Sequence, residues 1–219
     1  MPRLSSAEHA TETRDRILRA ASDLFATMGF NGATLREITE RAGANLAAVN
    51  YYFRTKEDLI ISTIEEAVRP LVTARMMALQ NCLEFSKPNL PNIDQMAEAL
   101  VGPLLTFSKG ENRNRLLLLM QIRSDPEGDY NAVVVEHFKP LHELFVTNLK
   151  AVLPHLTKSE IAFRYDCARG ATLQSLIELA PARTLVSLPQ SERENMATIK
   201  RRKSTLVKFV SAGFQAPAD

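Results

Sequence analysis

Glycine and cysteine are scarce in this sequence of 219 residues, which contains eight glycines and two cysteines. With so few glycines, and few places where β-branched and polar residues alternate, the sequence disfavours strands and hairpins. Cys82 and Cys167 are far apart, so they supply neither a disulfide framework nor a C-x-x-C motif for metal or redox chemistry. We expect both to be reduced, partly buried small apolar residues.

Long apolar runs and a dominant charge are also missing. The longest aliphatic run, 116–120, is far shorter than the roughly 20 residues of a bilayer-spanning helix, so we expect no membrane span. Residues 1–10 lack the apolar core of a secretion signal and look like a flexible lead-in, which predicts a cytoplasmic protein. The net charge is only +2. Any contact with nucleic acid therefore depends on local placement of charge.

Motifs for catalysis and metal binding are absent from the sequence. It contains no G-x-S-x-G, no P-loop and no G-x-G-x-x-G. His137 and His142 are five residues apart, which places them on different helix faces and not in the i, i+4 pair of a zinc-binding helix. Cys167 has no neighbouring histidine. We therefore expect neither an enzyme nor a metal site, and no cofactor.

Helical periodicity dominates the first half of the sequence. Apolar residues recur at helical spacing up to Gly29, where a helix end favours a left-handed residue, and this predicts a helix over 13–28. Thr34 and Glu37 form a capping-box pattern that predicts a second helix over 35–42.

A third helix and then a fourth follow. Gly43 interrupts the second helix, and Asn45 can cap a short third helix over 46–52. A fourth helix is expected from Lys56 to about residue 83, with Pro70 kinking it or ending its first half. The proline-containing segment 86–92 is the clearest loop. Further helices are predicted over 93–107, 112–124, 129–153, 158–179 and 189–212.

The first three helices together predict a helix-turn-helix, in which a short recognition helix is presented to the major groove of DNA. Val49 and Phe53 are at i and i+4, so both should pack inward. Their expected partners are Leu24, Phe25, Leu35 and Ile38. The opposite side should carry Leu46, Ala47, Asn50 and Tyr51, a surface suited to base edges and phosphates.

The segments 13–25 with Gly29 and Phe30, 34–43, and 50–59 carry the N-terminal pattern of a known family. Over about 11–67 the sequence resembles the TetR family of bacterial repressors. Three residues depart from the pattern: Ala44 stands where valine is usual, Thr39 where alanine is usual, and Asn50 where many members have tyrosine. Base preference is therefore left open. The string 45–51 is similar to a branch in which some members respond to fatty acyl or other hydrophobic effectors.

The resemblance implies a set of DNA contacts. Thr34 and Arg36 would meet backbone phosphates, and 45–51 would enter the groove. The amide of Asn50 can pair with adenine, worth about 1–3 kcal/mol of discrimination, and Lys56 can hold a phosphate at a helix N-terminus. The predicted DNA-binding residues are Thr34, Arg36, Asn45, Leu46, Ala47, Asn50, Tyr51, Tyr52 and Lys56. The alternatives are a solvated Arg36, an idle Asn50, and Tyr51 and Tyr52 partly buried against the fourth helix.

The rest of the chain is expected to be a helical bundle. The whole is thus predicted to be all-α, with a helix-turn-helix domain over 1–56 and an effector-binding and dimerisation domain over 57–219. The helices over 158–179 and 189–212 are assigned to the homodimer interface. The residues predicted to form the helix-helix seam are Ile161, Tyr165, Ala168, Thr172 and Leu176. The candidate effector contacts are Phe107, Met120, Arg123, Phe138 and Phe163, although core packing explains the apolar ones equally well and Arg123 can form a surface salt bridge.

These features predict a ligand-responsive transcriptional regulator. The expected protein is a repressor that binds a double-stranded, inverted-repeat operator as a homodimer and is released by a small hydrophobic effector. A helical adaptor that binds only protein, with the basic residues 200–203 as its charged end, is the alternative. Specific, salt-dependent binding to DNA would distinguish the two.

Overall fold

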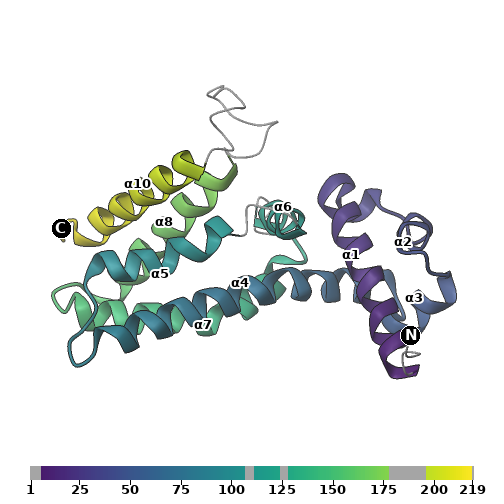
Figure 1. Cartoon of the computed structure of the whole chain (residues 1–219), viewed down its shortest axis with the longest axis horizontal. Helices are drawn as coiled ribbons and strands as arrows, with labels where there is room; N and C mark the ends of the chain where they lie inside the picture. Colours follow the sequence, from purple (N-terminus) through teal and green to yellow (C-terminus); the bar gives the residue numbers. More distant parts are fainter. Residues whose placement is uncertain (1–5, 107–110, 124–127, 178–195, 219) are drawn as a thin grey trace. The chain divides into compact units, whose positions relative to one another are not determined.

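The computed structural model describes residues 6–106, 111–123, 128–177 and 196–218, and all regular secondary structure in these ranges is helical (Figure 1). The predicted all-α fold is therefore confirmed. The helices are α1 (Ser6–Gly32), α2 (Leu35–Ala42), α3 (Leu46–Phe53), α4 (Lys56–Ser86), α5 (Ile93–Thr106), α6 (Glu111–Arg123), α7 (Asn131–Val152), α8 (Lys158–Ile177) and α10 (Met196–Gln215).

Two helices run further than the sequence predicted. α1 begins at Ser6, so residues 6–10, expected to be a flexible lead-in, belong to a helix that no glycine or proline interrupts before Gly29. α4 continues through Pro70, which was expected to kink or end it. Val68 and Leu71, on either side of the proline, are buried, and this packing offsets the lost hydrogen bond.

The helices divide into two compact units, which we call unit 1 and unit 2. Unit 1 contains the described parts of residues 1–70 and 110–137, and unit 2 contains those of 71–109 and 138–219. Unit 1 thus includes α6 and the first parts of α4 and α7 in addition to the three N-terminal helices. The predicted functional boundary after residue 56 stays a prediction.

The core of unit 1 forms where α1 packs against α2, α3 and α6 (Figure 1). Ile17 and Phe25 of α1 are fully buried, as are Ile38 of α2 and Val49 of α3. Burial of such side chains contributes about 1.5–3 kcal/mol each, which is the main force holding the short helices in place. The expected packing is confirmed, except that Leu24 and Leu35 are only half-buried.

Glycine is required at one end of α1. Gly29 has φ 76° and ψ 169°, a conformation that residues with a side chain rarely adopt. A Cβ at this position would also approach Nε2 of Gln121, on α6, to 3.2 Å. The helix is therefore kinked at Gly29, where its end was predicted, but it continues to Gly32, just before the buried Ala33.

Unit 2 is built around α5, α8 and α10, which contact one another in all three pairs (Figure 1). Leu100 of α5, Tyr165 of α8 and Phe214 of α10 are almost completely buried. The N-terminus of α8 is held by a capping box, in which the backbone N–H of Glu160 donates to Oγ1 of Thr157 at 3.2 Å and the carboxylate accepts from the backbone N–H of Thr157 at 2.7 Å.

The predicted dimer seam on α8 is wrong in one respect. Ile161, Tyr165, Ala168 and Thr172 are all buried within the chain's own unit 2, so they are not available to a second subunit. Leu176, whose side chain lies outside the described residues, completes the predicted seam. Cys82 is half-buried, as expected. Cys167 was also expected to be partly buried, but it is exposed, because it lies on the outward face of α8.

Tyr130 connects three parts of unit 1. Its hydroxyl donates to Oε2 of Glu57, at the start of α4, over 2.8 Å. Its ring lies 4.7 Å, between centroids, from that of Phe30, which in turn contacts Phe25. Burial, followed by the hydrogen bond to the Glu57 carboxylate, raises the pKa of Tyr130 to about 12.

Substitution of Tyr130 with phenylalanine should therefore change stability at alkaline pH. Because the folded pKa of about 12 is above the ordinary value of 10.0, this tyrosine's contribution is complete below pH 10 and is lost as pH rises towards 12. The wild type should lose more stability than Tyr130→Phe between pH 9 and pH 11, measured by urea denaturation. An equal loss in both proteins would show that the Glu57 contact does not persist in solution.

Candidate nucleic-acid interface

The short helix α3 is held by defined ends. Gly43, with φ 59° and ψ 38°, adopts the left-handed conformation that lets the chain turn from α2 into α3. Asn45 then accepts a hydrogen bond from the backbone N–H of Ala48 at its side-chain Oδ1, over 2.8 Å. This is the N-cap predicted from the sequence, and it satisfies one of the free amides of the first turn.

The two faces of α3 differ sharply in exposure. Val49 and Phe53 are buried, with Phe53 only 2% exposed, and they anchor the helix to the core of unit 1. On the other side Leu46 is 51% exposed and Tyr51 is 79% exposed. Ala47 and Asn50 are also exposed. The predicted free surface of alanine, asparagine and tyrosine is therefore confirmed.

Aromatic contacts fix the C-terminal end of α3. The rings of Tyr51 and Tyr52 meet edge to face with centroids 5.0 Å apart, and Tyr52 is half-buried. The guanidinium carbon of Arg14, on α1, lies 5.6 Å from the centroid of the Phe53 ring. Partial burial was the alternative considered for both tyrosines. It is wrong for Tyr51, which is exposed, whereas Tyr52 is indeed half-buried.

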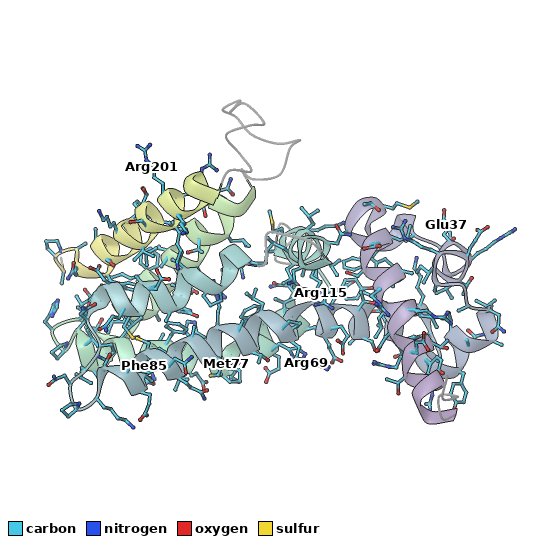
Figure 2. The ribbon with its side chains drawn as sticks, viewed as in Figure 1. Glu37, Arg69, Met77, Phe85, Arg115 and Arg201 are labelled. Atoms are coloured by element: carbon cyan, nitrogen blue, oxygen red, sulfur yellow. The ribbon has the colours of Figure 1, made fainter. Side chains whose placement is uncertain are left out.

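The start of α2 carries a closed capping box. Thr34 donates its hydroxyl to Oε2 of Glu37 at 2.7 Å, and the same hydroxyl accepts from the Glu37 backbone N–H at 3.2 Å. These hydrogen bonds hold the pKa of the Glu37 carboxyl below its usual value, and the charge of Lys56 acts in the same direction (Figure 2). Arg36 is exposed beside the box. Lys56 and Arg36 therefore supply positive charge at this end of α2.

Arg54 was missed by the sequence analysis. It is the C-cap of α3, is exposed, and has φ 49° and ψ −52°, a backbone conformation that strains a residue with a side chain. Arg54 follows the buried Phe53, and α4 begins only two residues after Arg54, at Lys56. Its position in the sequence, between Phe53 and Lys56, could have identified it. With Arg36 and Lys56, it is the third cation near the N-terminal helices α2 and α3.

Asn45 allows the helix cap to be tested apart from the exposed face. Asn45→Ala removes the acceptor for the Ala48 N–H and should lower the free energy of unfolding by about 1 kcal/mol. Asn45→Asp keeps an equivalent cap but adds a negative charge, so it should preserve stability while weakening any binding to DNA. Thermal unfolding measures the first effect and a gel shift the second. Full stability in Asn45→Ala would show that the cap is not needed.

The predicted effector contacts lie in different parts of the chain. Met120, half-buried, and Arg123, exposed, are on α6 in unit 1. Phe138, half-buried on α7, and Phe163, on α8, belong to unit 2, and Phe107 lies outside the described residues. Phe163 is 71% exposed and borders a groove between α8 and α10. The grouping of the five around one effector stays a prediction.

The described residues contain no group of three or more histidine, cysteine or acidic side chains that could hold a metal ion. His137 and His142 instead face Glu65 and Asp166, at 4.0 and 3.9 Å. None of the described helices is long and apolar enough to cross a membrane.

The short helix α3 follows the tight turn at Gly43, packs against α1 and α2 and leaves one face exposed, which is the arrangement of a helix-turn-helix DNA-binding domain. Residues 17–63 match the family described as bacterial regulatory proteins of the tetR family, and residues 98–213 match the tetracyclin repressor-like C-terminal domain. The chain belongs to the TetR family. Members of this family are transcriptional regulators and not enzymes.

Individual relatives agree with this assignment. Over 145 residues the chain is 30% identical to the HTH-type transcriptional repressor BepR of Brucella suis; the match covers 64% of this chain and 66% of the repressor, just under two thirds. A TetR-like transcriptional regulator from Rhodococcus superposes with a TM-score of 0.67 at 19% identity, over 98% of this chain and 100% of that one. A regulator from Saccharomonospora viridis, solved in complex with choline, gives 0.64 at 14% identity, covering 91% and 96%.

Proposed function

We propose that the chain is a cytoplasmic repressor that binds an inverted-repeat operator as a homodimer and is released by a small, hydrophobic effector. The observation that carries this proposal is the free face of α3, where Ala47 and Asn50 are exposed beside Tyr51. Small side chains let the helix approach base edges closely, and the amide can donate to and accept from adenine. Relatives support the direction of control, since BepR is itself a repressor.

The proposed DNA contacts fall into two groups. Residues 45–51 of α3 with its cap read base edges, and Asn50 is the most specific of them. Thr34, Arg36, Tyr52 and Lys56 contact the phosphate backbone, and we add Arg54 to this group because it is exposed at the end of α3. Both hydrogen-bonding functions of the Thr34 hydroxyl are used in the capping box, so any contact of Thr34 with a phosphate is shared with Glu37.

The proposed dimer uses the outer faces of α8 and α10. Phe163 and Phe209 are 71% and 64% exposed, and they border a groove of about 450 Å³ together with the small residues Ala171 and Gly213. Large apolar side chains beside small ones allow two copies of the same surface to interlock across a twofold axis. The exposed phenylalanines therefore replace the buried seam expected from the sequence.

A small-molecule effector is supported by the fold. The Saccharomonospora neighbour was solved with choline, so a regulator of this architecture can hold a small molecule. The predicted contacts Phe107, Met120, Arg123 and Phe138 remain candidates, and the apolar majority of this set favours a hydrophobic ligand. Phe163, also predicted as an effector contact, is exposed on α8 and is assigned to the proposed dimer surface instead. The identity of the effector is best approached by screening small molecules for an increase in unfolding temperature.

The proposal is tested by a gel shift against the promoter beside the chain's own gene, repeated across salt concentrations. A repressor should bind an inverted repeat tightly, with half-sites about 34 Å or a multiple apart and a steep loss of affinity as salt rises. Asn50→Ala should relax preference at one base pair, whereas Lys56→Ala should weaken binding to all sequences alike. Equal losses across operator variants for both substitutions would refute the assigned roles, and no specific binding at all would refute the function.

A further inference from the structure

A cavity of about 340 Å³ lies within unit 1, between α1, α4 and α6, and none of its lining residues belongs to the proposed DNA-binding or dimer surfaces. Its polar lining residues are Asp15, Arg19, Ser22, Asp23, Thr63, Glu66 and Arg115. Leu18 and Ala67 add an apolar part. Its volume is within the range of sites that bind small molecules, and its lining is mostly polar, with Asp15 and Arg19 exposed to solvent.

The hydroxyl of Ser22 is the clearest sign that the cavity takes a ligand. Its Oγ is buried and has no hydrogen-bond partner. Elsewhere on α1, Thr27 donates its hydroxyl back to the carbonyl of Asp23 at 2.9 Å, which is the usual way a helix satisfies such a group. A buried hydroxyl left without a partner is costly, so a hydrogen bond from Ser22 to a molecule in the cavity would be favourable.

The charges around the cavity favour an anion. Both oxygens of Asp23 are already bound, to Nη2 of Arg41 at 3.0 Å and to Nδ2 of Asn114 at 2.6 Å. Glu66 is paired with Arg69 at 2.9 Å. No carboxylate of the described residues forms an ion pair with Arg115, whose Nη1 donates only to the neutral Oδ1 of Asn112, at 3.1 Å.

Arg19 adds a second cation to this wall. Its Nε donates to the backbone carbonyl of Asp15 at 3.4 Å, which leaves the rest of its guanidinium for another partner. Among the described residues, Asp15 is then the one acidic side chain of the lining that forms no ion pair. Two arginines of the lining, Arg19 and Arg115, also form none, so the unpaired charge is positive. Figure 2 marks Arg115 on α6.

From this arrangement we propose that the cavity binds a small organic anion, whose carboxylate or phosphate group pairs with Arg115 and Arg19 and hydrogen-bonds to Ser22. The carbon part of the ligand lies against Leu18 and Ala67. Thr63 is buried and donates its hydroxyl to the carbonyl of Leu59 at 2.7 Å, so its oxygen can accept a hydrogen bond only from a hydroxyl on the carbon part of the ligand. An ordered water would satisfy Ser22 alone, but it would not supply a negative charge to pair with Arg115, which is half-buried.

The proposal is tested by calorimetric titration of the full-length protein with succinate, glycerol 3-phosphate and inorganic phosphate, at constant ionic strength. Saturable binding of succinate or glycerol 3-phosphate is expected, and the stronger of the two tells whether the site prefers a carboxylate or a phosphate. Binding of inorganic phosphate alone would refute an organic ligand. No binding of any of the three would mean that the cavity holds only water, and the proposal would fail.

Three variants of the cavity lining and one control variant test whether the ligand binds in this cavity. Arg115→Gln and Ser22→Ala should each weaken binding roughly tenfold, because each removes a hydrogen bond to a charged group. Glu66→Gln should strengthen binding by removing a negative charge from the wall, a gain that unfolding cannot produce. Arg201→Gln, an exposed change on α10 in unit 2, should have no effect. If Glu66→Gln weakens binding while Arg115→Gln strengthens it, the site selects a cation and our assignment is wrong.

Discussion

Replacing Phe53 with alanine should lower the free energy of unfolding by about 3–5 kcal/mol, the cost typical of removing a buried phenylalanine ring. Phe53 is 2% exposed and ends α3, so its ring fixes the helix to the core of unit 1. The substitution also removes the contact with the guanidinium of Arg14. Urea denaturation followed by circular dichroism measures the loss, and a change below about 1 kcal/mol would show that α3 is not anchored in this way.

Tyr51→Ala is the matched control, because this ring is only two residues away and 79% exposed. Its loss should change stability by no more than about 0.5 kcal/mol. Under the proposed function it should nevertheless weaken operator binding, since the ring belongs to the free face of α3. Normal DNA binding by Tyr51→Ala, together with an unstable protein, would reverse the roles given to the two faces.

The ends of the N-terminal helices could be predicted because their causes are local. The Thr34 hydroxyl caps Glu37 three residues on, and Asn45 caps Ala48 in the same way. Such side chains compete for backbone groups within one helical turn, so the sequence alone shows the partner. The inward face of α3 was equally readable, because Val49 and Phe53 are separated by about one turn.

Contacts between distant segments left no such local signal. Asn114 donates to Asp23 across 91 positions, and Tyr130 to Glu57 across 73. Each of these side chains could equally well form hydrogen bonds with water. Only the packing of the helices brings the two members of each pair together. The cavity between α1, α4 and α6 was missed for the same reason, since its polar lining comes from three separate stretches of sequence.

The faces of α8 were also ambiguous in the sequence. Ile161 and Phe163 are both large and apolar, yet the first is fully buried and the second 71% exposed. A helix with apolar residues on several sides can pack in more than one way, so periodicity does not tell which side meets its own subunit. The predicted seam was therefore on the side that is filled within the chain, whereas Phe163 was predicted to be an effector contact and Phe209 had no predicted role.

Charged substitutions on that exposed side should have the largest effect on function. Phe163→Asp combined with Phe209→Asp places carboxylates in the proposed interface, where burial without a partner is strongly unfavourable. We expect the double variant to be a folded monomer by sedimentation analysis. Its affinity for a two-half-site operator should fall by about 10²–10⁴-fold, because the second half-site is no longer bound by a tethered partner.

Phe85→Asp provides the control for this experiment, since Phe85 is 85% exposed on α4 and does not border the groove between α8 and α10. It introduces the same charge at an equally exposed phenylalanine and should leave both the dimer and operator binding intact. If Phe85→Asp dissociates the dimer while the α8 and α10 variant does not, the subunits meet through α4. Dissociation by neither substitution would place the interface on another surface, and the apolar groove would then need a different occupant.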